Sequence, residues 1–187
     1  MRVGSGLGDV HMAGSGPRGT ASLSGLGSNE LIAIGGSITR GLVLAGAVQG
    51  SSISMTFDGG PFVGEKVSSS GGSLTASSKA DATFGTLGLL VDWYPNPSDG
   101  WHVGLSAGLG FTSVKNHADD STMTGTSTAG SIFGGYDWAI GPGWSLGLAL
   151  VGSGALSASM KDSSDQPDTG YRLKSYSLGF SASFLYF

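Results

Sequence analysis

Long segments of this chain alternate between bulky apolar residues and small or polar ones. Between residues 144 and 160, Trp, Leu and Met fall on even positions, while the odd positions are small and largely polar. The ranges 83–94, 101–111 and 176–186 repeat this pattern. A period of two points alternate side chains to opposite faces of a β-strand. The segments therefore predict strands with one apolar face.

These runs are longer than ordinary strands, which average about five or six residues. A tilted strand needs about 9–11 residues to cross a bilayer. We predict an all-β fold, a closed up-and-down antiparallel transmembrane β-barrel of eight strands. The expected strands cover roughly 2–13, 20–36, 41–57, 79–94, 101–116, 122–140, 143–160 and 171–187.

Composition excludes several other classes. The chain has 35 Gly among 187 residues, and an interior Gly costs a helix about 1 kcal/mol, which argues against a helical bundle. No stretch reaches the roughly 18 apolar residues that a membrane-spanning helix needs. There is no Cys, so disulfides and thiolate metal sites are absent. A net charge of −4 offers no basic stripe for nucleic acid.

The connections between the expected strands alternate in length, so residues 1–187 are interpreted as one barrel domain. Pro and Asp-Gly in the segment 95–100 are typical of a tight turn. We predict short turns at about 37–40, 95–100 and 141–142, and longer loops at about 14–19, 58–78, 117–121 and 161–170.

All four Trp lie beside the predicted short turns, and Tyr186 falls at the same end of the barrel. A Trp ring prefers the membrane–water interface, where its apolar body and its N–H are both satisfied. We interpret the set as an aromatic girdle. The alternative is that each Trp anchors the core of a soluble sandwich. The girdle residues are Trp93, Trp101, Trp138, Trp144 and Tyr186.

An open strand edge in lipid would leave backbone groups without partners, so the sheet must close. The pattern resembles the small eight-stranded outer-membrane barrels of Gram-negative bacteria, of the OmpX, OmpW and OmpA-transmembrane-domain kind. The segment 176–187, ending in Phe187, resembles the signal read by the outer-membrane assembly machinery. Phe187 falls on the odd positions, opposite to the apolar face. Either a bulge near Leu185 or folding of Phe187 under the rim would explain this.

The resemblance implies a bacterial outer-membrane location, with both termini and the short turns in the periplasm and the long loops outside the cell. It also implies an export signal, and the start of this chain shows no basic segment followed by an apolar one. We expect the lipid bilayer and the assembly machinery as partners, no nucleic acid, and a monomer.

The residues that the same parity places on the inner face have small side chains. It comprises Gly104, Ser106, Gly108, Ser145, Ser153, Ser157, Ser177 and Ser181. Side chains normally just fill an eight-stranded barrel. One hypothesis is a partly hydrated lumen that passes water or small solutes. The other is that small residues only permit tight strand coiling and compact packing.

A polar group falls on the inward parity near the expected periplasmic end: Asp92, Tyr94, His102 and Asp137. Buried carboxylates need partners, and His102 can pair with Asp92 across the hairpin. The group is either a structural plug or a proton-linked gate, because His titrates near neutrality.

Three functions are compared. The first is a narrow outer-membrane pore, and the second is a non-conducting surface barrel whose loops serve adhesion or envelope structure. The third is a soluble lipocalin-like binder, which the 12% charged content is too low to solubilise. No Ser/His/Asp order, HExxH or P-loop occurs, so no catalytic residues are assigned and we expect no enzyme. His11, His102 and His117 are scattered, and we expect no metal and no cofactor.

Overall fold

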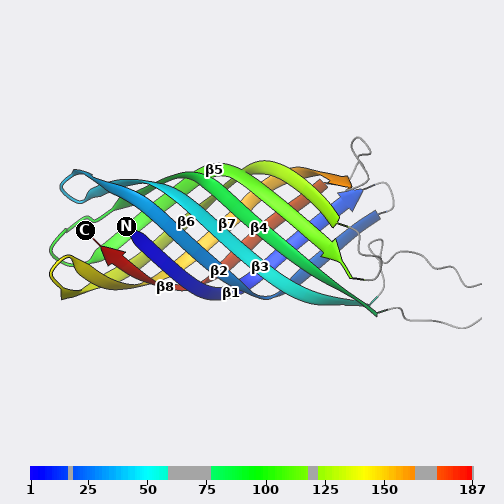
Figure 1. The fold of residues 1–187 in the computed structure, drawn as a ribbon, viewed down its shortest axis with the longest axis horizontal. Coiled ribbons are helices and arrows are strands. Elements are labelled where there is room, and N and C mark those ends of the chain that lie inside the picture. The colour runs from blue at the N-terminus through cyan, green and yellow to red at the C-terminus, as the bar shows by residue number, and fades with distance from the viewer. Residues whose placement is uncertain (17–18, 59–76, 118–121, 163–171, 187) are drawn as a thin grey trace, which may run out of the picture.

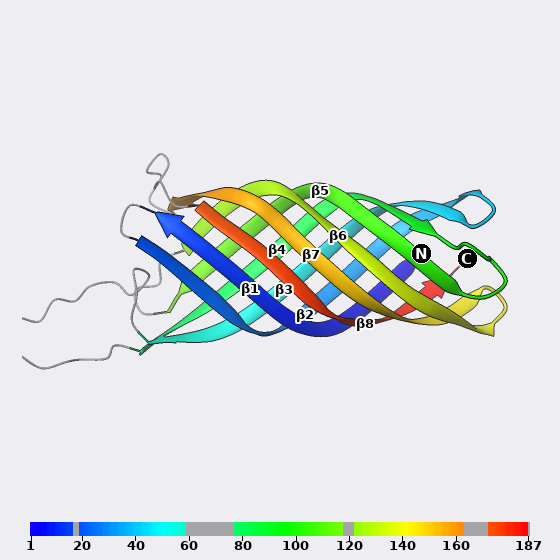
Figure 2. The same ribbon diagram turned by 180° about the vertical axis from the view of Figure 1, so that it is seen from behind.

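The computed structural model describes residues 1–16, 19–58, 77–117, 122–162 and 172–186. Eight strands follow one another around a closed ring, each antiparallel to its neighbours, and β8 pairs with β1 (Figures 1 and 2). The predicted all-β, eight-stranded barrel is confirmed. The strands are β1 (Arg2–Gly16), β2 (Gly19–Thr39), β3 (Leu42–Asp58), β4 (Ser77–Trp93), β5 (Trp101–Asn116), β6 (Thr122–Gly141), β7 (Trp144–Asp162) and β8 (Arg172–Tyr186). No helix in these ranges is long and apolar enough to cross a membrane.

Three tight turns and the chain's start lie at one end of the barrel, which we call the turn end (Figure 1). Each turn contains a glycine with positive φ: +80° at Gly41, +73° at Gly100 and +75° at Gly143. Two of these turns therefore come slightly later in the chain than the predicted positions 37–40 and 141–142, because β2 continues to Thr39 and β6 continues to Gly141.

The opposite end, here called the loop end, carries the other four connections, residues 17–18, 59–76, 117–121 and 163–171, so the first of them is not the longer loop predicted at 14–19. The strands continue further into the predicted loops than their polar sequences indicated. Pairing reaches Gly16 with Gly19 between β1 and β2, and Asp58 with Ser77 between β3 and β4. Backbone hydrogen bonding needs no apolar side chain, so the ladder extends beyond the alternating sequence pattern.

The strands are staggered around the ring. Starting at Arg2 and stepping from each residue to its partner on the next strand returns to β1 at Met12, ten residues further along. Such a stagger tilts the strands against the barrel axis. The path runs through Ala33, Ala47, Gly88, Gly108, Ala129, Ala155 and Ser175.

The outer face is apolar over most of its height. Leu26, Ile132 and Leu156 are each about 70% exposed, at 73%, 70% and 69%. Ring closure pairs the strand edges, so the barrel can expose this surface to hydrocarbon without unpaired backbone groups. The chain is a closed eight-stranded β-barrel with an apolar outer face.

The last strand alternates without interruption. Its even positions are exposed from Arg172 to Tyr186, and its pairing with β7 is continuous at Leu185 and Tyr186. The bulge considered near Leu185 is therefore absent. Phe187 lies outside the described residues.

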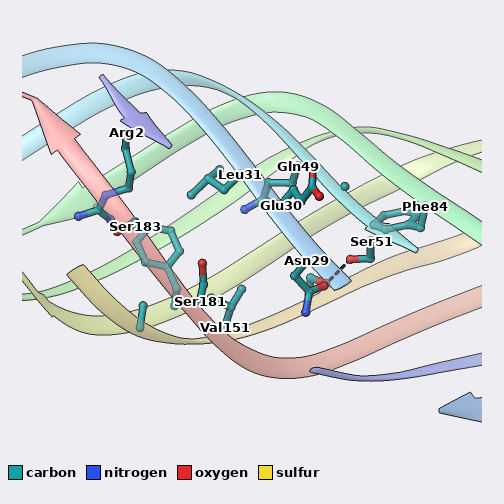
Figure 3. Close-up of a pocket in the computed structure, with 14 residues that line it drawn as sticks. Arg2, Asn29, Glu30, Leu31, Gln49, Ser51, Phe84, Val151, Ser181 and Ser183 are labelled. Atoms are coloured by element: carbon teal, nitrogen blue, oxygen red, sulfur yellow. Dashed lines mark hydrogen bonds between the residues drawn. The ribbon is translucent and has the colours of Figure 1, made fainter. Parts of the chain in front are cut away.

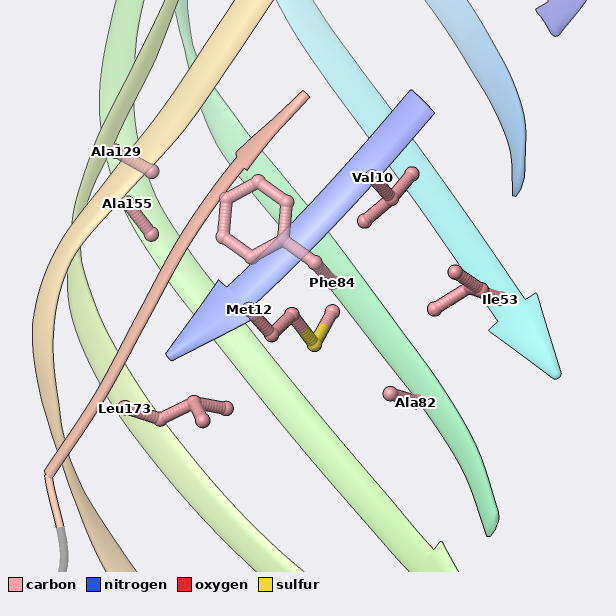
Figure 4. Packing of buried hydrophobic residues seen from close by; sticks show 8 residues of the cluster. All are labelled: Val10, Met12, Ile53, Ala82, Phe84, Ala129, Ala155 and Leu173. Carbon is pink, nitrogen blue, oxygen red and sulfur yellow. The ribbon is translucent and has the colours of Figure 1, made fainter. Parts of the chain in front are cut away.

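Apolar side chains, from Ala to Met, Leu and Phe, fill much of the interior, which the prediction of a Gly/Ser lumen missed. Towards the loop end they form what we call the loop-end layer: Val10, Met12, Ile53, Ala82, Phe84, Ala129, Ala155 and Leu173 (Figure 4). Nearer the turns they form the turn-end layer: Ala33, Ala45, Ala47, Leu90 and Phe133. Met12 is completely buried, and Val10 is 2% exposed.

Candidate functional site

Four polar residues predicted on the inward parity lie together at the turn end, around a fifth that the prediction missed. Asp92 is near the end of β4, Tyr94 follows that strand, His102 is near the start of β5, and Asp137 is on β6. Arg2, the first residue of β1, lies among them. Each of the five is at least nine-tenths buried. We call this group the Arg2 cluster.

The Arg2 guanidinium joins the two carboxylates. Its Nη1 lies 3.0 Å from Asp92 Oδ2, and its Nη2 lies 2.5 Å from Asp137 Oδ2. The same Nη2 donates to the Tyr94 hydroxyl at 2.9 Å, and that hydroxyl donates to Asp137 Oδ2 at 2.6 Å. A guanidinium presents several donors in a fixed plane, which suits it to bridge two carboxylates.

His102 completes the contacts of Asp92. Its Nδ1 lies 2.8 Å from Asp92 Oδ1, and its Nε2 lies 3.8 Å from Asp137 Oδ2. The imidazole stacks on the Tyr94 ring at a centroid distance of 5.1 Å, and Phe133 borders it at 5.9 Å. The imidazole is therefore held between a carboxylate and aromatic rings, away from solvent.

Burial has two further consequences in the Arg2 cluster. It raises the pKa of the Tyr94 phenol, which lies just beyond the end of β4, so this side chain stays a neutral donor. Arg2 Nε and Asp137 Oδ1 are buried without a hydrogen-bond partner among the described residues. Such atoms carry a desolvation cost.

The predicted lining residues with described side chains are buried or half-buried. Ser106 donates to Gln49 at 3.0 Å and lies 2.8 Å from Ser131. Ser153 and Ser177 are hydrogen-bonded at 2.6 Å. The other members are Gly104, Gly108, Ser145 and Ser181; the side chain of Ser157 lies outside the described part.

Small residues of the lining make room for larger neighbours. A Cβ at Gly104 would overlap the ring of Phe133, and one at Gly147 would overlap the carboxylate of Asp137. A Cβ at Gly110 would approach the ring of Phe84 at 3.3 Å. This geometry favours compact packing over a hydrated lumen.

A small cavity separates the two apolar layers. Polar groups of Asn29, Gln49 and Ser51 share its wall with Phe84 and Val151, and Asn29 accepts a hydrogen bond from Ser51 at 2.5 Å (Figure 3). The volume open to the centres of water molecules is about 40 Å³, room for about three waters. Arg2 borders this cavity, and it also borders a second hollow at the turn-end mouth. The Arg2 cluster therefore stands between the lumen and the mouth.

The five predicted girdle residues point outward at the turn end. Their exposures are 52% for Trp93, 61% for Trp101, 47% for Trp138, 49% for Trp144 and 52% for Tyr186. Trp144 contacts Tyr186 at a centroid distance of 4.8 Å, and Trp101 contacts Tyr136 edge-on at 5.2 Å. None of them anchors the interior of the barrel.

Sequence reasoning missed Arg2, Gln49 and Asn29. The sequence did contain evidence for Arg2. Two inward carboxylates in one barrel require a cation, and Arg2 has the parity of the buried Gly4 and Gly8. Alternation in the first strand was too weak to reveal that parity. No group of His, Asp or Glu suited to a metal ion occurs among the described residues.

No family model matches the chain, and no curated protein matches it. Among solved structures it is similar to Ail, the attachment invasion locus protein of Yersinia pestis, at 8% identity over 97% of each chain (TM-score 0.45). It is also similar to Neisserial surface protein A, at 14% identity over 99% of this chain and 97% of that one (TM-score 0.46). OprG from Pseudomonas aeruginosa shows 13% identity over 97% and 95% (TM-score 0.45). At these identities and TM-scores, nothing about site or activity transfers to this chain.

Proposed function

We propose that the protein is a non-conducting outer-membrane barrel that presents its loop-end connections for adhesion or envelope structure. The observation that carries this proposal is the filling of the lumen. The completely buried Met12 and its apolar neighbours occupy the loop end, and the Arg2 cluster occupies the turn end.

The pore hypothesis stays a prediction, and the packing weighs against it. A solute would have to displace two apolar layers and separate Arg2 from both carboxylates. Separating a buried charge from its partner costs about 3–5 kcal/mol. The small Gly and Ser residues support tight packing instead, as the overlap of a Gly104 side chain with Phe133 illustrates.

Planar-bilayer conductance tests the proposal. Refolded protein is first shown to be folded by its heat-modifiable gel migration and is then inserted at known density. We expect no discrete current steps at any voltage that the bilayer withstands. Reproducible steps from correctly folded protein would contradict a closed lumen and establish the pore.

Orientation belongs to the same proposal. We place the turn end, with both termini, in the periplasm and the loop end outside the cell, and we assign assembly to the C-terminal strand. An epitope inserted in the 59–76 connection should be detected on intact cells, whereas one inserted at Ser98 should not. The opposite labelling pattern would reverse the orientation.

A further inference from the structure

The outer face of the barrel is hollowed between β6 and β7, which lie beside β8 and β1 on one side of the molecule (Figure 2). The side chains that border the hollow on this face are the exposed Ile132 of β6 and Leu156 of β7. The hollow therefore opens on the apolar outer surface, and we call it the β6–β7 groove. Its wall consists of Ser106, residues 128–132, residues 152–156 and Ser177.

An absent side chain keeps the β6–β7 groove open. Gly152 lies at an outward position, and a Cβ there would meet no atom closer than 3.7 Å, from Ile132, or 3.9 Å, from Leu178. Packing within the barrel therefore does not require this glycine. The volume open to the centres of water molecules is about 640 Å³, against about 40 Å³ for the cavity in the lumen. An empty hollow of that size forfeits van der Waals contacts, which a hydrocarbon chain lying in it would restore.

The groove lies just inside one expected edge of the membrane. Tyr186 belongs to the aromatic girdle, and Tyr176 lies ten residues earlier on the same strand, within the about 9–11 residues that a tilted strand needs to cross a bilayer. Tyr176 is exposed and stacks on His11 at a centroid distance of 4.6 Å. Because a Tyr ring prefers the membrane–water interface, this pair marks the level of the headgroups. Gly152 pairs with Leu178, one outward position nearer the girdle, which places the groove against hydrocarbon.

Two cations follow Tyr176 on the side of the loop end. Lys174 and Arg172 occupy the next outward positions of β8, and both side chains are exposed. Among the described residues neither makes a hydrogen bond or an ion pair. Lys174 lies across from Leu156 and Ser157 of β7, where the pairing of the two strands shifts. Since Leu156 belongs to the wall of the groove, the two cations stand at its loop-end rim.

The charges around the rim favour an anion. Asp9 is the only carboxylate with a described side chain on β1 and β8, and it lies opposite Leu178, on the hydrocarbon side of His11. Lys174 and Arg172 lie on the other side of His11. An anionic headgroup at the rim of the groove therefore meets two cations before it meets this carboxylate.

We propose that the β6–β7 groove and these two cations form a binding site for a lipid with a phosphate headgroup. One acyl chain lies in the groove, and the phosphate contacts Lys174 and Arg172. A guanidinium suits bidentate contact with a phosphate, and an ammonium adds a compact positive charge. A lipid is the occupant that fits, because it carries an apolar chain and an anionic group in the same order along the membrane normal as the groove and its rim. The site goes beyond the proposed function and rests on the membrane location that belongs to it.

Native mass spectrometry of the refolded barrel in a neutral detergent tests the inference by counting bound lipids. The probes are phosphatidic acid and phosphatidylcholine with identical acyl chains. We expect one phosphatidic acid to bind about 25-fold more tightly than phosphatidylcholine at low salt, because each Lys or Arg near an anionic lipid contributes about fivefold. Glycerol 3-phosphate, which has the phosphate but no acyl chain, should not displace the lipid at equal concentration.

Substitutions separate the rim from the groove. Lys174→Gln and Arg172→Gln should each weaken the binding of phosphatidic acid about fivefold. Arg40→Gln, in an exposed turn at the opposite end, is the charge control and should leave that binding unchanged. Gly152→Ile fills the groove and should weaken the binding of both lipids. Gly46→Ile is its matched control and should have no effect, since a Cβ at this outward position on β3 also meets no atom closer than 4.0 Å.

All variants are compared only after heat-modifiable migration shows that they are folded. Equal affinity for the two lipids, or equal losses in Gly152→Ile and Gly46→Ile, would overturn the proposal. Displacement by glycerol 3-phosphate at equal concentration would reduce the site to a phosphate-binding rim and would also overturn it. Flotation with liposomes is measured separately. A barrel that binds phosphatidic acid as expected but does not float contradicts the membrane location, whereas one that floats without preferring phosphatidic acid contradicts the lipid site alone.

Discussion

Arg2 and Asp137 are separated by 135 positions in the sequence, yet the guanidinium Nη2 lies 2.5 Å from the carboxylate Oδ2 inside the barrel. Asp92 forms an ion pair with the other terminal nitrogen of Arg2. The contact thus links the first strand to β4 and β6 across the lumen. Arg2, at the start of the chain, therefore takes part both in the strand pairing that closes the barrel and in the contacts that close the lumen.

Replacing this cation should destabilise the barrel strongly. Arg2→Met leaves two buried carboxylates without their main partner, and we expect the free energy of unfolding to fall by about 3–5 kcal/mol. Urea titrations in lipid vesicles, followed by Trp fluorescence, measure it. Arg40→Met, at an exposed turn, is the control and should change stability by less than about 0.5 kcal/mol.

A triple variant makes the electrostatic origin of that loss testable. Arg2→Met combined with Asp92→Asn and Asp137→Asn removes the charges together, so most of the lost stability should return. A triple variant as unstable as Arg2→Met alone would show that packing of the arginine stem, and not charge pairing, stabilises this end.

A methyl group inside the lumen should be costly where the packing is tight. Gly104→Ala forces the Phe133 ring to move and should cost about 1–3 kcal/mol. Adding Phe133→Leu should recover part of the loss. Gly46→Ala, on the open outer face, should leave the free energy of unfolding nearly unchanged. Equal effects at both glycines would contradict a filled lumen.

The girdle predicts a common depth for all four Trp. Their outward side chains at the turn end should lie at the membrane interface. Fluorescence quenching by lipids brominated at different chain positions measures this depth. We expect the strongest quenching from bromine nearest the headgroups. Strongest quenching from bromine at the chain ends would place these residues near the bilayer centre instead.

The plug and gate interpretations of His102 differ in one observable. As part of a plug, His102 only fills and satisfies the turn end, so His102→Ala should produce no conductance between pH 5 and pH 8. Current that appears in the unsubstituted protein as the pH falls, and disappears in His102→Ala, would establish a proton-linked gate.

Much of this architecture could be predicted from alternation in single strands. The parity of residues 83–94, 101–111 and 122–140 already separates outer from inner faces, and it places Asp92, His102 and Asp137 on the inner face. The contents of the lumen could not be predicted in the same way. Which residues of the eight strands share one level of the lumen, as Val10, Phe84 and Ala129 do in the loop-end layer, depends on the stagger of ten residues around the ring, and a strand's own sequence does not encode that stagger. Arg2 was missed because the first strand alternates weakly.

Access to the middle of the lumen tests its closure most directly. Ser106 is 6% exposed and lies between Gln49 and Ser131. Since the chain lacks cysteine, Ser106→Cys provides a single thiol there, and Ser98→Cys provides one in an exposed turn. A small, charged thiol reagent added to both sides of proteoliposomes should label Ser98→Cys and leave Ser106→Cys unlabelled until the protein is denatured. Labelling of both at similar rates would show an open lumen and contradict a closed barrel.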